Sequence, residues 1–517
     1  MDKYNYNPHL YANTYEFLND IVEKYSERSA IRWMEQGIYK AKSYCDMMED
    51  INSFVMQMEE RKLVQRHIAL VGKPSYAWII GFLAILYSGS VAVPLNGLLP
   101  VENIKKDMAF ADASAVIIGD IDIQIREEIC LGSDIPCIDL DEMMAKKAER
   151  KKEEYAKVDT DALACIMFTT GTTGARKGVM LSQQNLMAGA TQAAAVSDVR
   201  KYNSALATLP NYHILELSGT YLSGLYFGCE LFLGKEIKYF SRNLKNEKPE
   251  IMEVVPLFLQ VMEKKIRRAI KKKGERKFYL ATLICRGLLK LGINAYTKVF
   301  WGIYEELGSN IKTFIVGGAF LSSETVSFFA KFGISVLQGY GMTETTGAVT
   351  CNRDYDINAK SVGRAMPFSE VRIKEGEVQV KGKNVMLGYY KEPELTKEAF
   401  DEGWLCTGDL GYIDEKGFLY LTGRKKNLII LSDGENVSPE MWEETIKSKC
   451  EDINDIIVFE QENKIMAKIY SESGEEGEIR KIIESFNTSI PYAQRIQKVI
   501  FNREPLPRTA TGKLKRD

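Results

Sequence analysis

One segment, rich in glycine and threonine, has residue types and a spacing that could bind a ligand. It follows the strand-like run Ala164 to Phe168 and reads Thr169, Thr170, Gly171, Thr172, Thr173, Gly174, Ala175, Arg176, Lys177, Gly178. Glycines allow close approach of a ligand, and successive backbone N–H groups can surround anionic oxygens. Threonine hydroxyls and the Lys177 charge add donors, so the segment predicts a phosphate-binding loop. The alternative is an ordinary polar turn. A Walker loop is excluded, because Lys177 precedes its glycine.

A second cluster combines glycine, an aromatic ring, threonine and a carboxylate. It follows the strand-like run Ile334 to Leu337 and consists of Gln338, Gly339, Tyr340, Gly341, Met342, Thr343, Glu344 and Thr345. Ligands of open α/β sheets bind at the carboxyl ends of strands. The cluster therefore indicates a ligand site at a strand end.

Two charged segments lie further along the chain. Thr407-Gly-Asp409 is followed fifteen residues later by Arg424. A carboxylate can accept hydrogen bonds from ribose hydroxyls, although an Asp in a turn and a surface Arg would each be ordinary. The chain closes on Pro507-Arg-Thr-Ala-Thr-Gly-Lys513-Leu-Lys-Arg516, where a basic terminus is usually a solvated tail.

Together these segments resemble the motifs of the acyl-adenylate-forming superfamily, which includes acyl-CoA synthetases, peptide-synthetase adenylation domains and firefly luciferase. The motifs occur in the family's order between residues 169 and 513. The resemblance implies an ATP- and Mg²⁺-dependent ligase that activates a carboxylic acid as an acyl-adenylate. It also implies that ATP or AMP contacts Thr169, Thr170, Gly171, Thr172, Thr173, Gly174, Lys177, Gly317, Gly318, Ala319, Gln338, Gly339, Tyr340, Gly341, Met342, Asp409, Leu421 and Arg424.

The resemblance also implies individual roles. Tyr340 would stack on adenine, and Asp409 would bind the ribose hydroxyls. Thr343 would bond the α-phosphate, and Glu344 would hold Mg²⁺. Lys513 would meet both the α-phosphate and the attacking carboxylate. The expected catalytic residues are thus Lys513, Thr343 and Glu344.

The expected reaction has two steps. First, a carboxylate attacks the α-phosphorus of ATP; with a pKa of about 4 to 5 it is already ionised and needs no general base. Catalysis then consists of positioning and electrostatic stabilisation. Second, a thiol attacks the mixed anhydride. The resemblance implies that the C-terminal domain rotates between the steps about Lys426, and that Gly434 lies in a loop lining the pantetheine channel.

The acid is indicated by Leu209 to Glu216, which resembles the His-x-x-Glu segment of long-chain fatty acyl-CoA synthetases. A glycine-spaced helix follows it. Residues 249–266 also resemble a segment that lies beside the acyl tunnel in that group. We therefore expect a medium- or long-chain fatty acid, with His213, Gly219, Gly318 and Gly341 as substrate contacts.

The acceptor is expected to be coenzyme A. Only 64 residues lie between Glu344 and Asp409, which leaves no room for the insertion that fatty acyl-AMP ligases commonly carry there. A free-standing ligase that loads an acyl or peptidyl carrier protein is the alternative. A catalytically silent ATP-binding scaffold is a further alternative from another class, against which the presence of Lys513 and Glu344 argues.

Composition excludes several other classes of function. The net charge is -2, from 68 basic and 70 acidic residues, so no overall field favours nucleic acid. Three histidines are too few for a zinc site built on several of them. Nine scattered cysteines and a start without a signal-peptide pattern predict reduced thiols in a cytoplasmic protein.

The elements that must position these residues indicate an α/β fold. Apolar strand-like runs, such as His67 to Val71 and Thr313 to Val316, alternate with helical stretches, which predicts a large N-terminal domain of parallel sheets. The alternation of apolar and polar residues over about 350–424 predicts a small β-barrel-like subdomain. Residues 425–517 are expected to form a small mobile α+β domain carrying Lys513, and residues 1–424 the adenylation domain.

Two segments raise the question of a membrane. The apolar run Trp78 to Leu95 is interrupted by Ser88, Gly89, Ser90 and Pro94, so we expect a buried helix followed by a buried strand. Residues 263–277 carry nine basic residues and precede an apolar stretch. Although a solvated helix face is the ordinary interpretation, 263–292 could contact the inner face of a membrane peripherally.

Overall fold

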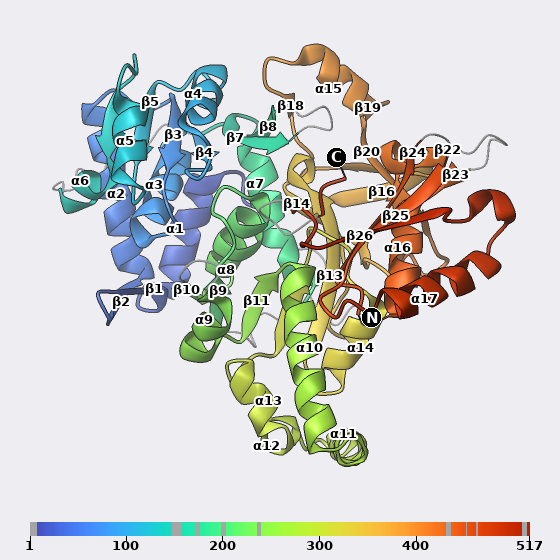
Figure 1. Cartoon of the computed structure of the whole chain (residues 1–517). Helices are drawn as coiled ribbons and strands as arrows, with labels where there is room; N and C mark the ends of the chain where they lie inside the picture. Colours follow the sequence, from blue (N-terminus) through green and yellow to red (C-terminus); the bar gives the residue numbers. More distant parts are fainter. Residues whose placement is uncertain are drawn as a thin grey trace.

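The computed structural model describes residues 8–146, 158–170, 176–197, 203–234, 239–430, 436–450, 452–461, 464–508 and 514–516. The described residues form two large sheets, a smaller antiparallel sheet, a two-stranded sheet of β22 (Ile429–Ile430) and β23 (Asn436–Val437), and a C-terminal three-stranded sheet (Figure 1). This mixed α/β architecture, with a β-rich part and a small C-terminal unit, confirms the predicted fold class.

The first large sheet has seven strands in the order β18-β8-β7-β4-β3-β5-β6. Strands β3 to β7 pair in parallel, whereas β8 returns antiparallel to β7. The strands are β3 (His67–Val71), β4 (Val91–Leu95), β5 (Ala115–Ile118), β6 (Cys137–Asp139), β7 (Leu163–Thr170), β8 (Arg176–Ser182) and β18 (Gly388–Tyr389). The phosphate-loop motif therefore joins two antiparallel strands.

Apolar helices cover the first sheet. Every residue of α3 (Tyr76–Tyr87) is buried apart from Ala77, which packs partly buried against the core, and the chain then enters β4. This confirms that Trp78 to Leu95 is a buried helix followed by a buried strand. Helices α1 (Thr14–Tyr25), α2 (Tyr44–Glu60) and α7 (Gln183–Thr191) contribute to the same core.

The second large sheet has nine strands in the order β15-β14-β13-β12-β11-β9-β10-β1-β2. Its central strands pair in parallel and both edges are antiparallel. The strands are β1 (Ser29–Glu35), β2 (Ile38–Ser43), β9 (Ser204–Ala207), β10 (Glu230–Leu233), β11 (Ile251–Val254), β12 (Thr313–Val316), β13 (Ser335–Met342), β14 (Gly347–Cys351) and β15 (Arg364–Ala365).

The remaining strands are mainly antiparallel. The five-stranded sheet contains β16 (Ser369–Lys374), β17 (Glu377–Gly382), β19 (Phe400–Asp401), β20 (Trp404–Ile413) and β21 (Leu419–Arg424). The C-terminal sheet contains β24 (Asp455–Gln461), β25 (Lys464–Tyr470) and β26 (Lys498–Asn502). Its apolar core includes residues of α16 (Pro439–Ser448) and α17 (Glu476–Thr488).

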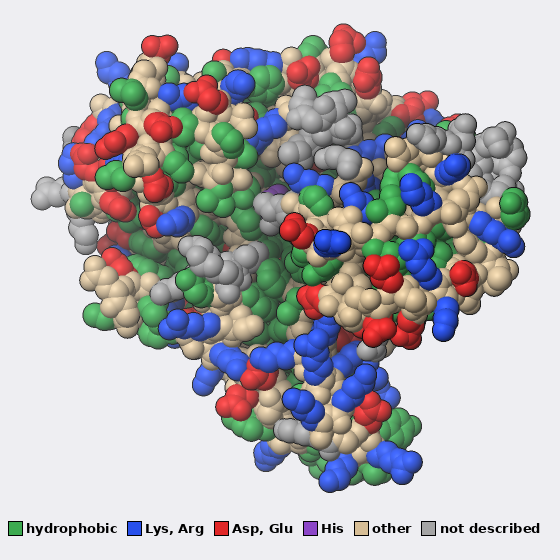
Figure 2. All heavy atoms as spheres, in the orientation of Figure 1, with side chains coloured by type: hydrophobic (Ala, Val, Ile, Leu, Met, Phe, Trp, Pro, Cys, Tyr) green, Lys and Arg blue, Asp and Glu red, His purple; other side chains and the backbone are tan. Residues whose placement is uncertain are grey.

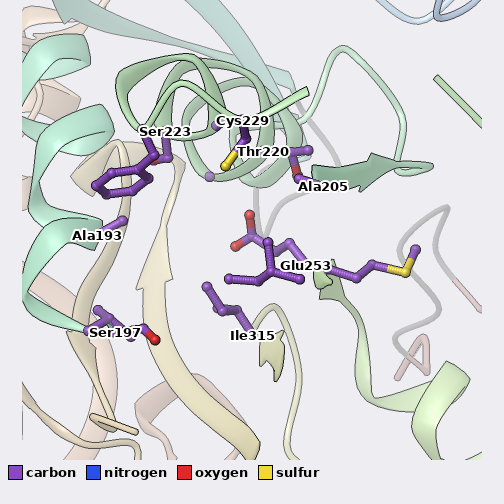
Figure 3. Close-up of a pocket in the computed structure, with 14 residues that line it drawn as sticks. Ala193, Ser197, Ala205, Thr220, Ser223, Cys229, Glu253 and Ile315 are labelled. Carbon is purple, nitrogen blue, oxygen red and sulfur yellow. The ribbon is translucent and has the colours of Figure 1, made fainter. Parts of the chain in front are cut away.

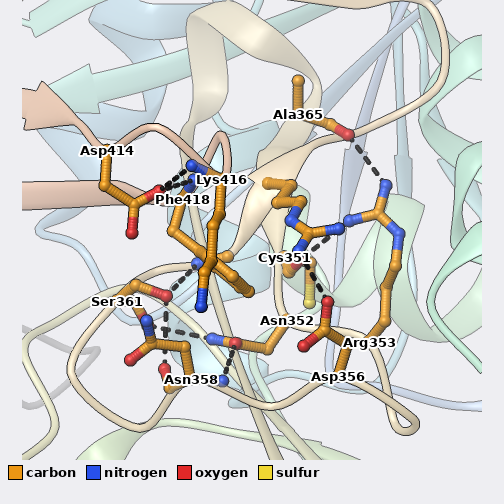
Figure 4. A network of polar contacts seen from close by, with 12 residues as sticks. Cys351, Asn352, Arg353, Asp356, Asn358, Ser361, Ala365, Asp414, Lys416 and Phe418 are labelled. Carbon is orange, nitrogen blue, oxygen red and sulfur yellow. Dashed lines mark hydrogen bonds and ion pairs between the residues drawn. The ribbon is translucent and has the colours of Figure 1, made fainter.

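A polar network fixes the loop that leaves β14 (Figure 4). The buried Arg353 guanidinium donates to the carbonyl of Ala365 at 3.0 Å, while Asn352 donates to the carbonyl of Ser361 at 2.9 Å and accepts from the Asn358 N–H at 2.8 Å. Because buried polar groups cost free energy unless they are paired, these bonds fix the loop that joins β14 to β15 at the edge of the second sheet.

A helical lobe projects from the second sheet, formed by α10 (Pro256–Lys273), α11 (Glu275–Lys290), α12 (Tyr296–Val299) and α13 (Trp301–Glu306) (Figure 1). Among the described residues, no helix combines the length and apolar character that a membrane span requires.

Candidate active site

The β7–β8 hairpin, which contains the predicted phosphate-binding segment, forms one side of the site. In the β7–β8 ladder, Thr169 lies opposite Lys177 and Thr170 opposite Arg176. Gly171, Thr172, Thr173 and Gly174 lie outside the described residues. Arg176 forms an ion pair with buried Asp107 at 2.5 Å, which ties β8 to α4 (Val101–Phe110). The strand that carries Lys177 is therefore fixed by its pairing with β7 and by this ion pair with α4.

Lys177 is linked to the second sheet through Tyr389. Its Nζ lies 4.9 Å from the centroid of the Tyr389 ring, and the Tyr389 hydroxyl donates to Glu344 Oε1 at 3.0 Å. Burial, and the neighbouring Glu344 carboxylate, raise the pKa of Tyr389, so its hydroxyl stays protonated as a donor. Tyr389 reaches this place because β18 pairs with β8, with Tyr389 opposite Val179. We name Lys177, Tyr389 and Glu344 the phosphate-side row.

Glu344 lies in a short 3-10 turn, Thr343–Thr345, directly after β13. The sequence predicted that the strand ends at Leu337, which is wrong: β13 continues through Gln338, Gly339, Tyr340, Gly341 and Met342. Gly339 to Met342 pair antiparallel with β14, and that pairing outweighs the weak strand preference of glycine. A Cβ at Gly341 would collide with the backbone of Gly347, so only glycine fits. The motif is thus the end of a strand with Thr343 and Glu344 just beyond it.

A second cluster lies on the β-rich side of the same strand. The Tyr340 hydroxyl donates to Asp409 Oδ2 at 2.8 Å, and Arg424 Nε lies 2.8 Å from Asp409 Oδ1. Asp409 and Arg424 face each other across the β20–β21 ladder. Asp409 is 4 % exposed and Tyr340 8 %. We name Tyr340, Asp409 and Arg424 the ribose-side cluster, after the role predicted for Asp409. Leu421 lies on β21, the strand that carries Arg424, and is exposed.

The glycine turn after β12 lies beside these residues. Val316 pairs with Gln338 in the β12–β13 ladder, and the Gln338 side chain donates to the carbonyl of Leu321 at 2.8 Å. Gly317 is buried and its added Cβ would contact Leu215, whereas Gly318 and Ala319 are exposed. The turn is therefore open to solvent on one side and closed by Leu215 on the other.

Leu215 begins a π-helix, η3 (Leu215–Leu222), which runs into α8 (Ser223–Tyr226). The sequence predicted a glycine-spaced helix here, and the wider winding places Gly219 directly against the carboxyl of Glu253 on β11. π-helical turns are rare and frequent at functional sites. His213 precedes the helix with its ring 5.2 Å from that of Tyr212.

Of the predicted site residues, the structure brings Lys177 to Glu344, Tyr340 to Asp409 and Arg424, and Gly317 to the π-helix that contains Gly219. Lys513 and Gly434 lie outside the described residues, and Lys426 lies in a 3-10 turn, Lys425–Asn427. No described group of three or more His, Cys, Asp or Glu residues could hold a metal ion.

Sequence reasoning missed Tyr389 and Glu253. Tyr389 lies more than 200 residues from Lys177, so only the strand pairing reveals it. Glu253 has a visible signal in the sequence, because it is an acid within the apolar run Ile251 to Val255.

The chain matches the family model described as AMP-binding enzyme over residues 18–390, and the AMP-binding enzyme C-terminal domain over 426–517. The long-chain-fatty-acid–CoA ligase FadD15 of Mycobacterium bovis is 30% identical over 417 residues, covering 74% of this chain and 69% of that one. A 2-succinylbenzoate–CoA ligase of Listeria monocytogenes is 28% identical, covering 87% of each chain. The o-succinylbenzoate coenzyme A synthetase of Bacillus subtilis, solved with ATP and magnesium, shares the fold with a TM-score of 0.75, 22% identity and coverage of 96% of this chain and 98% of that one.

Proposed function

We propose that this chain, which belongs to the AMP-binding enzyme family of acid–CoA ligases, activates a medium- or long-chain fatty acid as its adenylate and transfers the acyl group to coenzyme A. The observation that carries this proposal is the convergence of the phosphate-side row and the ribose-side cluster on the two ends of one short segment, residues 340–344. The relatives act on fatty acids and on 2-succinylbenzoate, so the fatty acid is the part of the proposal that rests on the segment around His213.

The nucleotide would lie along this segment. Asp409, already fixed by Tyr340 and Arg424, would accept the ribose hydroxyls. Tyr340 would contact adenine through its ring, since its hydroxyl is engaged with Asp409. Lys177 and the loop before it would hold the β- and γ-phosphates, and Thr343 the α-phosphate. The order of these side chains along the segment matches the order of groups in ATP.

Glu344 suits the role of a Mg²⁺ ligand. The hydrogen bond from Tyr389 occupies its Oε1 and leaves Oε2 for a cation. The carboxylate is 8 % exposed, so its charge is weakly screened. Magnesium, when bound, neutralises phosphate charge and is commonly held by one or two carboxylates together with the phosphates.

Adenylation would need no proton transfer from the protein. The substrate carboxylate attacks the α-phosphorus, the bond to the bridging oxygen breaks, and pyrophosphate leaves with its charge held by Lys177 and the loop. Lys513 would supply positive charge at the reacting centre. For the thiol step, residues 425–517 would rotate against residues 1–424 about Lys426, withdraw Lys513 and bring Gly434 to the pantetheine channel.

The Lys513→Ala variant tests the assignment. We expect it to lose exchange of labelled pyrophosphate into ATP while retaining ATP binding, because it removes charge from the reacting centre alone. Lys515→Ala, two residues away in the same basic tail, is the matched control and should retain exchange. Full exchange by Lys513→Ala would contradict the assignment. The absence of pyrophosphate release by the unaltered protein with fatty, aromatic and amino acids would favour a silent scaffold.

The acceptor is tested in the same assay. Thioester formation with coenzyme A, but not with a carrier protein bearing phosphopantetheine, is expected. The opposite preference would establish the carrier-loading alternative.

We also propose that the helical lobe contacts an anionic membrane surface. One side of α11 packs on the core through Phe278 and Cys285, while the other side exposes Tyr279, Leu280, Leu283 and Ile284. Lysine and arginine side chains gather over the same lobe (Figure 2). An exposed apolar face rimmed by cations is typical of a helix that lies at a lipid interface.

Sedimentation with phospholipid vesicles tests this contact. The unaltered protein should bind vesicles containing anionic lipid, with binding that weakens as salt rises. Leu280→Ser combined with Ile284→Ser should reduce binding by about tenfold or more, since each side chain loses apolar burial. Ile123→Ser with Leu131→Ser removes equally exposed apolar side chains elsewhere and should leave binding intact. Equal losses in both double variants would contradict the proposal.

A further inference from the structure

A small cavity lies behind the glycine turn of the candidate site, between the π-helix and the second sheet (Figure 3). Its volume is about 50 Å³, and its walls are apolar or hydroxyl-bearing except for one acid. The lining includes Ala193, Ser197, Thr220, Phe227, Glu253 and Ile315. No lysine, arginine or histidine is among the described residues that line it.

Glu253 is the acid, and it points into this cavity (Figure 3). On β11, Met252 and Val254 belong to the core beneath the helical lobe, so Glu253 faces the π-helix instead. Its Oε2 is buried and has no hydrogen-bond partner in the part of the chain that the structure describes. Burial raises the pKa of the Glu253 carboxyl to about 8.

A second acid lies close by. Glu216 is 1 % exposed, accepts a hydrogen bond from Thr220 at 3.0 Å through Oε2, and leaves Oε1 without a partner among the described residues. Burial raises its pKa, and the nearby Glu253 carboxylate raises it further. Two buried carboxyls with one unpartnered oxygen each are costly for the folded chain, and a ligand that donates hydrogen bonds would offset that cost.

The position of the cavity connects it with the acid substrate. Ile315 lies two residues before Gly317, and Leu215, at the start of the π-helix, contacts the Gly317 position. Gly219, a predicted substrate contact, leaves the space that the Glu253 carboxyl occupies. An acyl chain that starts at the glycine turn and runs inward would therefore end near Glu253.

We propose that Glu253 recognises a hydrogen-bond donor, an amine or a hydroxyl, on the far end of the acid's chain. This inference rests on the proposed function, since it assigns the distal group of the same substrate. The cavity volume is close to that of one or two water molecules, which suits a single polar group and not a further length of chain. A purely apolar chain would leave the Glu253 Oε2 unpartnered.

Pyrophosphate release with matched acids tests this proposal. Straight-chain acids first establish the preferred length; acids with a terminal hydroxyl or amine and the same number of non-hydrogen atoms are then compared. The unaltered protein should favour a donor-bearing acid by about tenfold or more in kcat/KM, because the donor satisfies a buried oxygen that an apolar chain end would leave without a partner. A preference for the unsubstituted acid would overturn the proposal. No release with any acid would overturn the proposed function itself.

Two variants of Glu253 identify the donor. Glu253→Leu should reverse the preference towards the unsubstituted acid. Glu253→Gln keeps the shape and the acceptor but not the charge, so it should retain a hydroxyl preference and lose an amine preference. Glu250→Gln, which alters an ion-paired acid just before β11, is the matched control and should change neither. An unaltered preference in both Glu253 variants would also overturn the proposal.

Discussion

The ribose-side cluster and the cavity beside Glu253 both contain buried carboxyl groups, but the groups that surround these carboxyls differ. Asp409 is 4 % exposed and has a tyrosine hydroxyl on one oxygen and a guanidinium on the other. Glu216 is 1 % exposed, and together Glu216 and Glu253 have two oxygens without partners among the described residues. Similar burial therefore accompanies opposite degrees of pairing.

This difference indicates which kind of ligand suits each region. A buried acid with fixed donors is held in one orientation and can present its lone pairs to a ligand that is always the same, as ATP is. An acid that keeps one oxygen without a donor depends on its ligand to satisfy that oxygen, so it can distinguish substrates that bring a donor from those that do not. Under the proposed function, the ribose-side cluster is preorganised for the nucleotide and the cavity beside Glu253 selects among acids.

The largest expected effect is on the free energy of unfolding, and it arises from the Glu253 carboxyl in the cavity. Because folding raises the pKa of Glu253 to about 8, the folded protein binds a proton that the unfolded chain has lost above pH 5. Stability should therefore fall as pH rises from 5 to 8, by up to about 1.4 kcal/mol per pH unit for this group. Glu253→Gln should remove that contribution, giving a gain of up to about 4 kcal/mol at pH 8, measured by urea unfolding.

The groups facing Glu253 define the control for this experiment. Glu216 lies on the π-helix, and the Cys351 thiol on β14, whose pKa burial raises to about 12, stays neutral over this range. Glu250→Gln should leave the pH dependence unchanged. The same slope in Glu253→Gln as in the unaltered protein would show that Glu253 is paired after all, and would break the comparison.

The next effect concerns the paired acid. Asp409→Asn removes the charge that Arg424 and Tyr340 face and weakens hydrogen bonds to the ribose. Bonds to charged groups contribute about 1.5–3 kcal/mol, so KM for ATP in pyrophosphate exchange should rise by about 10- to 100-fold. Asp401→Asn, which alters a surface acid on the same sheet paired with Lys374, is the control. An unchanged KM would place the ribose elsewhere.

Much of the fold could be predicted from the sequence, because several strands are short, continuously buried apolar runs. His67 to Val71 and Thr313 to Val316 match β3 and β12 residue for residue. The continuation of β13 through Gly339 and Gly341 could not be predicted from the sequence, because glycine carries no strand signal and the pairing with β14 determines the strand there.

The same distinction holds for the site. The partnership of Asp409 with Arg424 follows from an antiparallel ladder within a short stretch of chain, and the motifs indicated it. Tyr389 depends on β18 pairing with β8, which brings together residues far apart in sequence. Glu253 stood out as an acid in an apolar strand, but the sequence does not say which face of β11 meets the π-helix.

The smallest expected effect tests whether the phosphate-side row is preorganised like the ribose-side cluster. Tyr389→Phe removes the bond to Glu344 while keeping the ring beside Lys177, so we expect about a tenfold loss in kcat/KM for pyrophosphate exchange, equivalent to about 1.4 kcal/mol. Tyr390, the residue after Tyr389, offers a matched control, because its hydroxyl donates at 2.8 Å to Asp112, an acid at the surface. Tyr390→Phe should leave the rate unchanged. If both variants behave alike, Glu344 does not need Tyr389 to hold its orientation, and preorganisation would be confined to the ribose side.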